Sequence, residues 1–159
     1  MNNNLKEITI VLIAYKSAIK IKRFVKNIPS SVKILIIDNS KDHNLKKIFK
    51  NKKNVKIYFK KNEGYGSSIN YASKIIKTEY FLIVQPDVIG IKKTSLLSFY
   101  KYAKILKDKF AVIGPHFKNA SKRGHYQTSL KYKIKEIHNV HGSTMFFNKK
   151  IFDKNGGFD

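Results

Sequence analysis

The sequence has no cysteine, no tryptophan and only three prolines in its 159 residues. Without thiols the chain can form neither a disulfide nor a thiolate metal site, which suits a reducing compartment. Long hydrophobic runs are also missing, because the run near the start, residues 8–15, is far shorter than the ~20 residues that span a bilayer. The start also lacks the charged lead and small-residue cleavage site of a signal peptide. These absences predict a soluble, cytoplasmic protein.

Acidic residues are scarce as well, with 10 Asp and Glu against 33 Lys and Arg and a net charge of +23. The excess is almost entirely lysine, since Arg23 and Arg123 are the only arginines. Nucleic-acid recognition favours arginine, whose planar fork forms paired hydrogen bonds with bases and phosphates. Nucleic acid is therefore not the expected partner. A weaker functional interpretation is attraction to anionic lipid at the inner face of the membrane, at ~1 kcal/mol per well-placed lysine.

Short apolar runs alternate with helical stripes along the chain. Runs typical of strands buried on both faces occupy residues 8–15, 32–37, 55–59 and 80–84. Between them apolar residues recur at helical spacing, as in Ile21, Phe24, Val25 and Ile28. This order predicts one α/β domain over residues 1–159, with a parallel sheet covered by helices on both faces. Further along we expect a helix after Thr94, strands at 110–114 and 140–147, and a loop at 117–135.

A polar segment follows each of the first four runs: Tyr15-Lys16-Ser17, Asp38-Asn39-Ser40, Asn62-Glu63-Gly64 and Gln85-Pro86-Asp87. Because the carboxyl ends of parallel strands meet at one edge of a sheet, we expect the four segments to line one crevice. There a carboxylate can accept hydrogen bonds from a base or a sugar hydroxyl, and Asp87 can hold a divalent cation together with substrate phosphates. Glycines before a helix let a phosphate approach its N-terminus. The pattern predicts a nucleoside-diphosphate site.

Two other phosphate-binding motifs do not fit the sequence. No G-x-x-x-x-G-K-[ST] segment is present, which excludes a P-loop. The pair Gly64 and Gly66 is followed by Ile69 where the dinucleotide fingerprint needs a third glycine, and it comes after the third predicted strand instead of the first. A dinucleotide-binding dehydrogenase is therefore disfavoured.

Five segments, taken in order, resemble a known family. They read ITIVLIAYKS, LIIDNSKD, NEGYGSSINYA, QPDV and HGSTMFFNKKIFDKNGGFD. In this order they resemble family 2 glycosyltransferases, and in particular the bacterial branch that includes rhamnosyltransferases of cell-surface polysaccharide synthesis. The resemblance runs from residue 8 to residue 159. It implies a Rossmann-like GT-A fold whose mixed, mostly parallel sheet has helices on both faces. In that fold the nucleotide-binding half lies at about 1–90 and the acceptor half begins at about 91–159.

The resemblance also implies roles for individual residues, carried over by motif. It implies that the nucleoside of an activated sugar is held by Tyr15, Asp38 and Asn39. It implies contacts along the nucleotide and sugar from Asn62, Gly64 and Asn70. Asp87 would be the remaining carboxylate of the metal-binding D-x-D motif and would hold Mg²⁺ or Mn²⁺. The sugar or acceptor cleft would be lined by Gly142 and Ser143, with the acceptor loop beginning at 156–159 and including Asp159.

The implied reaction is inverting transfer of a sugar from a nucleotide-diphosphate donor, with dTDP-rhamnose as the candidate, to a glycan or lipid-linked acceptor. Gln85 stands where this branch usually has Asn, so the metal site rests on Asp87 alone. Family members continue past G-G-F-D into a Glu-Asp pair whose Asp is the usual general base. We therefore expect the base beyond Asp159, with Asp159 itself as the lesser alternative. We also expect a C-terminally truncated member that binds donor with little turnover.

Two alternatives stay open on the sequence. One is a non-catalytic basic module that binds nucleic acid or anionic membrane in a salt-sensitive way. The other is a different nucleotide-using α/β enzyme, such as a nucleotidyltransferase, which would release pyrophosphate from a triphosphate.

Overall fold

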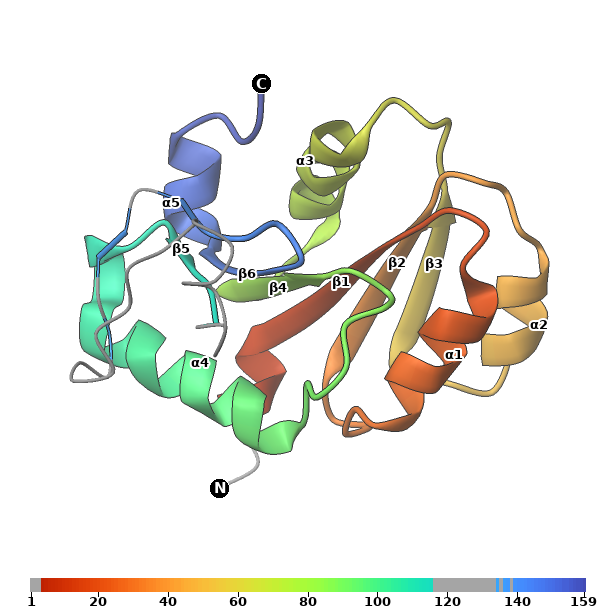
Figure 1. Cartoon of the computed structure of the whole chain (residues 1–159), viewed down its shortest axis with the longest axis horizontal. Helices are drawn as coiled ribbons and strands as arrows, with labels where there is room; N and C mark the ends of the chain where they lie inside the picture. Colours follow the sequence, from red (N-terminus) through yellow and green to blue (C-terminus); the bar gives the residue numbers. More distant parts are fainter. Residues whose placement is uncertain (1–3, 116–133, 135, 138) are drawn as a thin grey trace, which may run out of the picture.

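The computed structural model describes residues 4–115, 134, 136–137 and 139–159. This part of the chain builds a six-stranded sheet in the order β3-β2-β1-β4-β6-β5 (Figure 1). The strands are β1 Ile8–Ala14, β2 Lys33–Asp38, β3 Val55–Phe59, β4 Tyr80–Val84, β5 Val112–Ile113 and β6 Thr144–Asn148. The first four run parallel, whereas β6 is antiparallel to both β4 and β5. The predicted mixed, mostly parallel sheet is confirmed.

Helices cover both faces of the sheet, as predicted (Figure 1). They are α1 Ala18–Lys26, α2 Asn44–Phe49, α3 Tyr65–Ile75, α4 Lys93–Leu106 and α5 Lys149–Lys154, with short 3-10 turns η1 Asn4–Glu7 and η2 Lys107–Lys109. One core cluster packs α1, α2 and α4 on one face, and a second packs α3 and α5 on the other. Strand β1 serves both clusters, because Ile10 and Leu12 point to the first and Val11 to the second.

The central strand β4 determines where the later part of the chain joins the sheet. All five of its residues are buried, and its Phe81 stacks on Phe147 of β6 with ring centroids 4.9 Å apart. The antiparallel register pairs Val84 with Thr144. The residues that follow β4 therefore lie beside the residues that precede β6, and both groups border the edge where the parallel strands end.

Some element boundaries differ from the sequence prediction. Strand β5 covers only Val112–Ile113 of the predicted 110–114. It is followed by Gly114 and by Pro115, which has no N–H for a ladder. Strand β6 begins at Thr144 because the Thr144 N–H closes a turn onto the His141 carbonyl at 3.3 Å. Of the loop expected at 117–135, only residue 134 lies within the described residues. No helix in the described ranges is long and apolar enough to cross a membrane.

Candidate functional site

The parallel strands β1 to β4 end at one edge of the sheet, where a pocket of about 350 Å³ lies. Its lining comes from all four strand ends: Ile13, Ala14, Tyr15, Ser17, Lys20, Asn39, Asn62, Tyr65, Gln85, Pro86 and Asp87. This volume is within the ~300–1,000 Å³ common for small-molecule sites. The structure thus brings together the predicted residues Tyr15, Asn39, Asn62 and Asp87, whose donor-binding roles stay predictions.

Asp38, the last residue of β2, is fully buried and does not line this pocket. Its Oδ1 accepts hydrogen bonds from the Ser40 N–H at 3.0 Å and the Ser40 hydroxyl at 2.6 Å. Its Oδ2 accepts the Asp42 N–H at 2.6 Å. A buried carboxylate needs such donors. The charge of Asp38 therefore shapes the turn that follows β2, and this turn presents Asn39 to the pocket.

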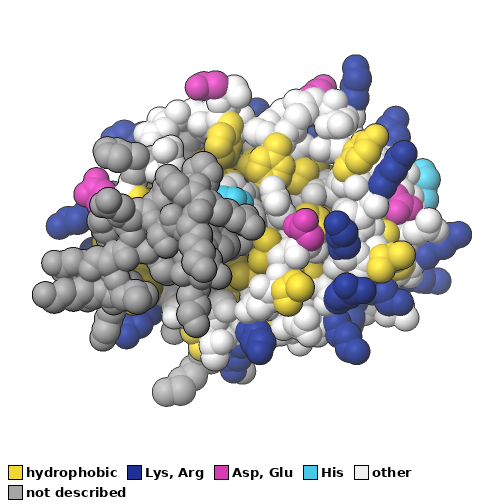
Figure 2. All heavy atoms as spheres, in the orientation of Figure 1, with side chains coloured by type: hydrophobic (Ala, Val, Ile, Leu, Met, Phe, Trp, Pro, Cys, Tyr) yellow, Lys and Arg dark blue, Asp and Glu magenta, His cyan; other side chains and the backbone are white. Residues whose placement is uncertain are grey.

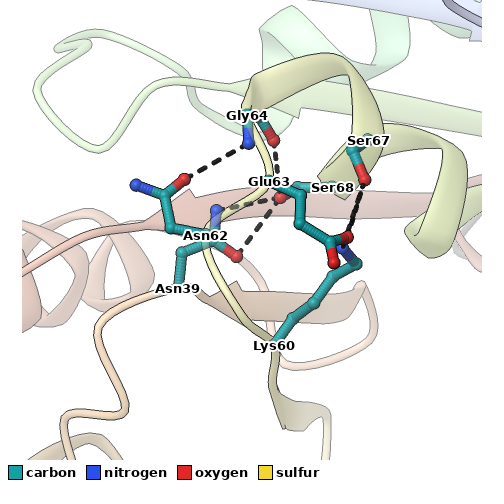
Figure 3. Close-up of polar contacts among 7 residues, drawn as sticks. All are labelled: Asn39, Lys60, Asn62, Glu63, Gly64, Ser67 and Ser68. Carbon is teal, nitrogen blue, oxygen red and sulfur yellow. Dashed lines mark hydrogen bonds and ion pairs between the residues drawn. The ribbon is translucent and has the colours of Figure 1, made fainter.

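Asn39 ties that turn to two neighbouring elements. Its N–H continues the sheet by donating to the Ala14 carbonyl at 2.9 Å. Its Nδ2 donates to the Ser68 hydroxyl of α3 at 2.9 Å, and that hydroxyl donates to the Gly64 carbonyl at 3.0 Å (Figure 3). The position of Asn39 is thus fixed from β1 and from α3 together.

Helix α3 begins with the glycine that the sequence singled out. Gly64 is the N-cap, with a φ of 95° that glycine adopts without strain, and its N–H donates to Asn62 Oδ1 at 3.3 Å. No side chain caps the helix, so the partial positive charge of its first turn favours an anion.

Lys60 lies beside the start of α3, where it pairs with Glu63 and donates to the Ser67 hydroxyl at 3.1 Å (Figure 3). The hydrogen bond from Lys60 lowers the pKa of Glu63. Much of the lysine charge is therefore compensated by the protein itself.

Asp87 is the acidic residue of the pocket, and it is exposed. It occupies a β-turn with Pro86 at the second position, closed by the Val88 N–H on the Gln85 carbonyl at 3.0 Å. Among the described residues its carboxylate has no hydrogen-bond or ion-pair partner, whereas bonds or ion pairs engage Glu7, Asp38, Asp42, Glu63, Glu79, Asp108 and Asp153. No group of three metal-ligating side chains occurs in the described ranges. A cation here would be held by Asp87 and ligand oxygens.

Gly142 and Ser143 do not line the pocket themselves but contact residues that do. The β4–β6 pairing places them beside Gln85, whose N–H donates to the Ser143 carbonyl at 2.9 Å. The Tyr65 hydroxyl donates to the Gly142 carbonyl at 3.1 Å, and burial raises the pKa of Tyr65 to about 12. The Ser143 hydroxyl shares a 2.8 Å hydrogen bond with His141 Nδ1. Each predicted residue thus contacts a residue that lines the pocket: Ser143 contacts Gln85, and Gly142 contacts Tyr65.

Three predicted site residues, Gly64, Asn70 and Asp159, line a second hollow of about 500 Å³. Its other lining residues are Lys60, Glu63, Gly66, Ser67, Tyr71, Lys74 and Phe158. Asn70 does not line the first pocket, and its amide is engaged by the backbone of Phe158 at 2.8 and 2.9 Å. The start of α3 therefore contributes to two separate hollows.

Sequence reasoning missed Tyr65 and Lys20 as lining residues. Tyr65 directly follows the polar segment Asn62-Glu63-Gly64, and this position was a usable signal. Lys20 lies three residues after Ser17, the N-cap of α1, so the two side chains are about one helical turn apart on the same face.

Residues 9–156 match the family model described as glycosyl transferase family 2. The chain belongs to this family. The resemblance to family 2 glycosyltransferases is confirmed. No curated protein sequence matches the chain.

Solved structures with this architecture include known glycosyltransferases. The mannosyltransferase PcManGT from Pyrobaculum calidifontis, in complex with GDP-Man and Mn²⁺, has a TM-score of 0.73 at 14% identity and covers 96% of this chain and 47% of that one. S. aureus TarS 1-349 has a TM-score of 0.64 at 21% identity, covering 94% of this chain and 49% of that one. Its complex with UDP-GlcNAc has a TM-score of 0.65 at 19% identity, covering 94% and 47%. At such identities the likeness shows the fold, which is GT-A, and the chain spans about half the length of these structures.

Proposed function

We propose that this chain supplies the donor-binding part of an inverting glycosyltransferase that uses a nucleotide-diphosphate sugar. The observation that carries the proposal is the pocket at the ends of β1 to β4, which combines an aromatic ring, two amides and an unpartnered carboxylate. These groups are Tyr15, Asn39, Asn62 and Asp87. They match the parts of a nucleotide sugar, which has a flat base, hydroxyl-rich sugars and two phosphates.

The donor would lie with its base near Tyr15 and its phosphates near Asp87. The Tyr15 side chain is 57% exposed at the pocket, so its ring is free to stack on a base. Asn39 would bond the nucleoside from the turn that Asp38 holds rigid. The uncapped start of α3 and Asn62 would lie along the diphosphate and the sugar. Relatives of this fold have been solved with GDP-Man and with UDP-GlcNAc, and dTDP-rhamnose is our proposed donor here.

A divalent cation, Mg²⁺ or Mn²⁺, fits beside Asp87. The carboxylate has no partner among the described residues and is exposed at the pocket, and one carboxylate with substrate phosphates is a common way to hold Mg²⁺. The bound cation would supply charge neutralisation for the departing diphosphate. Asp87 would hold and orient the donor, and the α3 start would add its partial positive charge to the same phosphates.

The acceptor side would be built by the later residues. We propose that residues 1–90 bind the nucleotide and that 91–159 begin the acceptor half of one GT-A domain, with Gly142, Ser143 and Asp159 near the sugar or acceptor. The acceptor would be a glycan or lipid-linked saccharide of cell-surface polysaccharide synthesis, met on the cytoplasmic side of the membrane. No residue of this chain is assigned as the general base that removes the acceptor proton.

Donor binding can be tested without turnover. Thermal unfolding is measured with dTDP, UDP and GDP, each with and without Mg²⁺ or Mn²⁺. A nucleotide at about 100 times its Kd stabilises the folded state by about 2.7 kcal/mol, which raises the Tm by several degrees in a domain of this size. Asp87→Asn should remove the metal-dependent part of the rise. Asp108→Asn, an equal charge change at an exposed residue outside both hollows, should keep it.

The absence of any rise with every nucleotide and metal would refute donor binding. Release of pyrophosphate from a nucleoside triphosphate would instead favour the nucleotidyltransferase alternative.

A further inference from the structure

The positive charges of this chain are not evenly matched by acidic residues along its sequence. Residues 15–37 and 43–62 contain no Asp or Glu, and these segments include α1 and α2. The ion pairs of the described residues involve Lys60, Lys104, Lys149 and Lys150, none of which belongs to either helix. The exposed cations of α1 and α2 therefore keep their full charge.

Helix α1 carries a stripe of exposed residues. Its buried residues Ile21, Phe24 and Val25 face the core. On the outer side Ile19 is three and four residues before Lys22 and Arg23, and these are four and three residues before Lys26; all four are exposed. The stripe thus begins with an apolar side chain and continues with three cations.

Two isoleucines project into solvent next to the pocket. Ile19 is 76% exposed and precedes the lining residue Lys20, while Ile89 is 92% exposed and follows the lining residue Asp87 by two positions. Figure 2 shows Lys and Arg side chains gathered over α1 and α2 on the right of the view, with hydrophobic side chains among them on the same face. An uncompensated basic surface with protruding isoleucines has the chemistry of an interface with anionic lipid, where cations meet headgroups and apolar side chains enter the acyl boundary.

We propose that this surface, formed by Ile19, Lys22, Arg23, Lys26 and Ile89 with the lysines of α2, docks on an anionic lipid bilayer. Docking places the mouth of the strand-end pocket at the lipid boundary, where a lipid-linked acceptor would present its sugar. The binding itself needs no donor, but this functional meaning rests on the proposed glycosyl transfer. Nucleic acid is disfavoured as the occupant, because the exposed isoleucines have no role on a phosphate backbone.

The test is co-sedimentation with vesicles of phosphatidylcholine alone and with vesicles in which about a third of the lipid is phosphatidylserine, at about 0.15 M salt. The protein should sediment only with the anionic vesicles. Each lysine near such a surface strengthens binding by about fivefold. Lys22→Glu/Lys26→Glu/Lys47→Glu should therefore lower the partition coefficient by about a hundredfold or more.

Matched controls separate this surface from overall charge. A triple change with the same charge difference away from α1 and α2, Lys77→Glu/Lys109→Glu/Lys154→Glu, should lower binding by less than about threefold. Ile19→Asn and Ile89→Asn should each weaken binding severalfold, whereas Ile105→Asn, at a 62% exposed isoleucine of α4, should not.

Four results would overturn the proposal: no binding to anionic vesicles, an equal loss from both lysine triples, equal effects of the three isoleucine changes, or displacement of the protein from vesicles by a short RNA duplex. The nucleotide-dependent Tm rise is measured on the same variants, none of which alters a pocket-lining residue. Failure of lipid docking and failure of donor binding can therefore be told apart.

Discussion

Asn70 of α3 holds the backbone of Phe158 through both of its amide atoms. Its Nδ2 donates to the Phe158 carbonyl at 2.8 Å, and its Oδ1 accepts the Phe158 N–H at 2.9 Å. The preceding Gly157 lies so close that an added Cβ would be 2.5 Å from Asn70 Oδ1. A Cβ added at Gly66 would likewise be 3.1 Å from the Phe158 Cβ. Two motifs that are far apart in the sequence, N-E-G-Y-G-S-S-I-N and G-G-F-D, therefore form one clasp.

Replacing Asn70 by Ala should open this clasp. The change removes two hydrogen bonds, so we expect a loss of about 1–3 kcal/mol in the free energy of unfolding, measured by urea denaturation. Asn51→Ala, at an exposed residue with no hydrogen bond among the described residues, should change stability by less than about 0.5 kcal/mol. Equal stabilities for Asn70→Ala and Asn51→Ala would contradict a structural role for Asn70.

Gly156 and Gly157 provide a matched pair for the same contact. Both have a positive φ, 83° and 88°, so alanine at either position costs about 1–2 kcal/mol of backbone strain. Only Gly157→Ala also collides with Asn70, because open space surrounds Gly156. We therefore expect Gly157→Ala to be the more destabilising in urea denaturation. Adding Asn70→Ala should relieve part of that excess, and identical effects of the two glycine changes would be inconsistent with the clasp.

The clasp shows what the sequence could and could not predict. The strands were predictable, because buried parallel strands such as β4 are continuous apolar runs that end at polar turns. The convergence of Tyr15, Asn39, Asn62 and Asp87 followed from the parallel order alone. The partner of a polar side chain did not follow, since nothing near Asn70 in the sequence indicates that its amide bonds a residue 88 positions away.

Asp38 illustrates the same difficulty. A carboxylate at a strand end is equally consistent with binding a ligand and with holding its own turn, and the sequence cannot tell the two apart. The structure shows three hydrogen bonds from Ser40 and Asp42 to this carboxylate.

The apolar pattern of β6 did not indicate that this strand runs antiparallel. Strand direction depends on the long connection from β5 and not on the apolar pattern of the strand itself.

Asp38→Asn should therefore weaken both the fold and donor binding. The amide loses the charge and turns one acceptor into a donor that faces other donors, at a cost of about 2–3 kcal/mol in urea denaturation. Because the turn positions Asn39, the nucleotide-dependent Tm rise should shrink as well. If Asp38 instead only contacted the nucleotide, binding would fall while the stability of the free protein stayed unchanged. Asp108→Asn is the control for a simple change of charge.

Acid should selectively remove the stabilisation that Asp153 provides. Burial raises the pKa of this carboxyl, but the hydrogen bonds from Lys149 and from Ser73, which joins α5 to α3 at 2.5 Å, outweigh burial and leave the pKa lowered. A lowered pKa in the folded state means that the stabilisation is present above the ordinary value of 3.8 and is lost as the pH falls below it.

Asp153→Asn should therefore cost about 1 kcal/mol at pH 7, a value kept small by solvent screening, and less near pH 3, below the ordinary pKa. Urea denaturation of both proteins at the two pH values measures the difference. A cost independent of pH would mean that shape, and not charge, is what Asp153 contributes.

Alkali should probe the contact between Tyr65 and the turn before β6. Burial raises the pKa of Tyr65 from 10.0 to about 12, so the phenol resists ionisation in the folded state. The stabilisation that the neutral phenol provides is therefore full below pH 10 and is lost as the pH rises through about 12. Tyr65→Phe removes the bond to the Gly142 carbonyl and should cost about 1 kcal/mol at pH 8. The stability advantage of the wild type over Tyr65→Phe should then shrink as the pH rises above 10. Tyr102→Phe removes a hydroxyl with no hydrogen bond among the described residues and should follow the wild-type curve throughout. A difference between wild type and Tyr65→Phe that stays constant with pH would show that the ionisation of Tyr65 is not linked to folding.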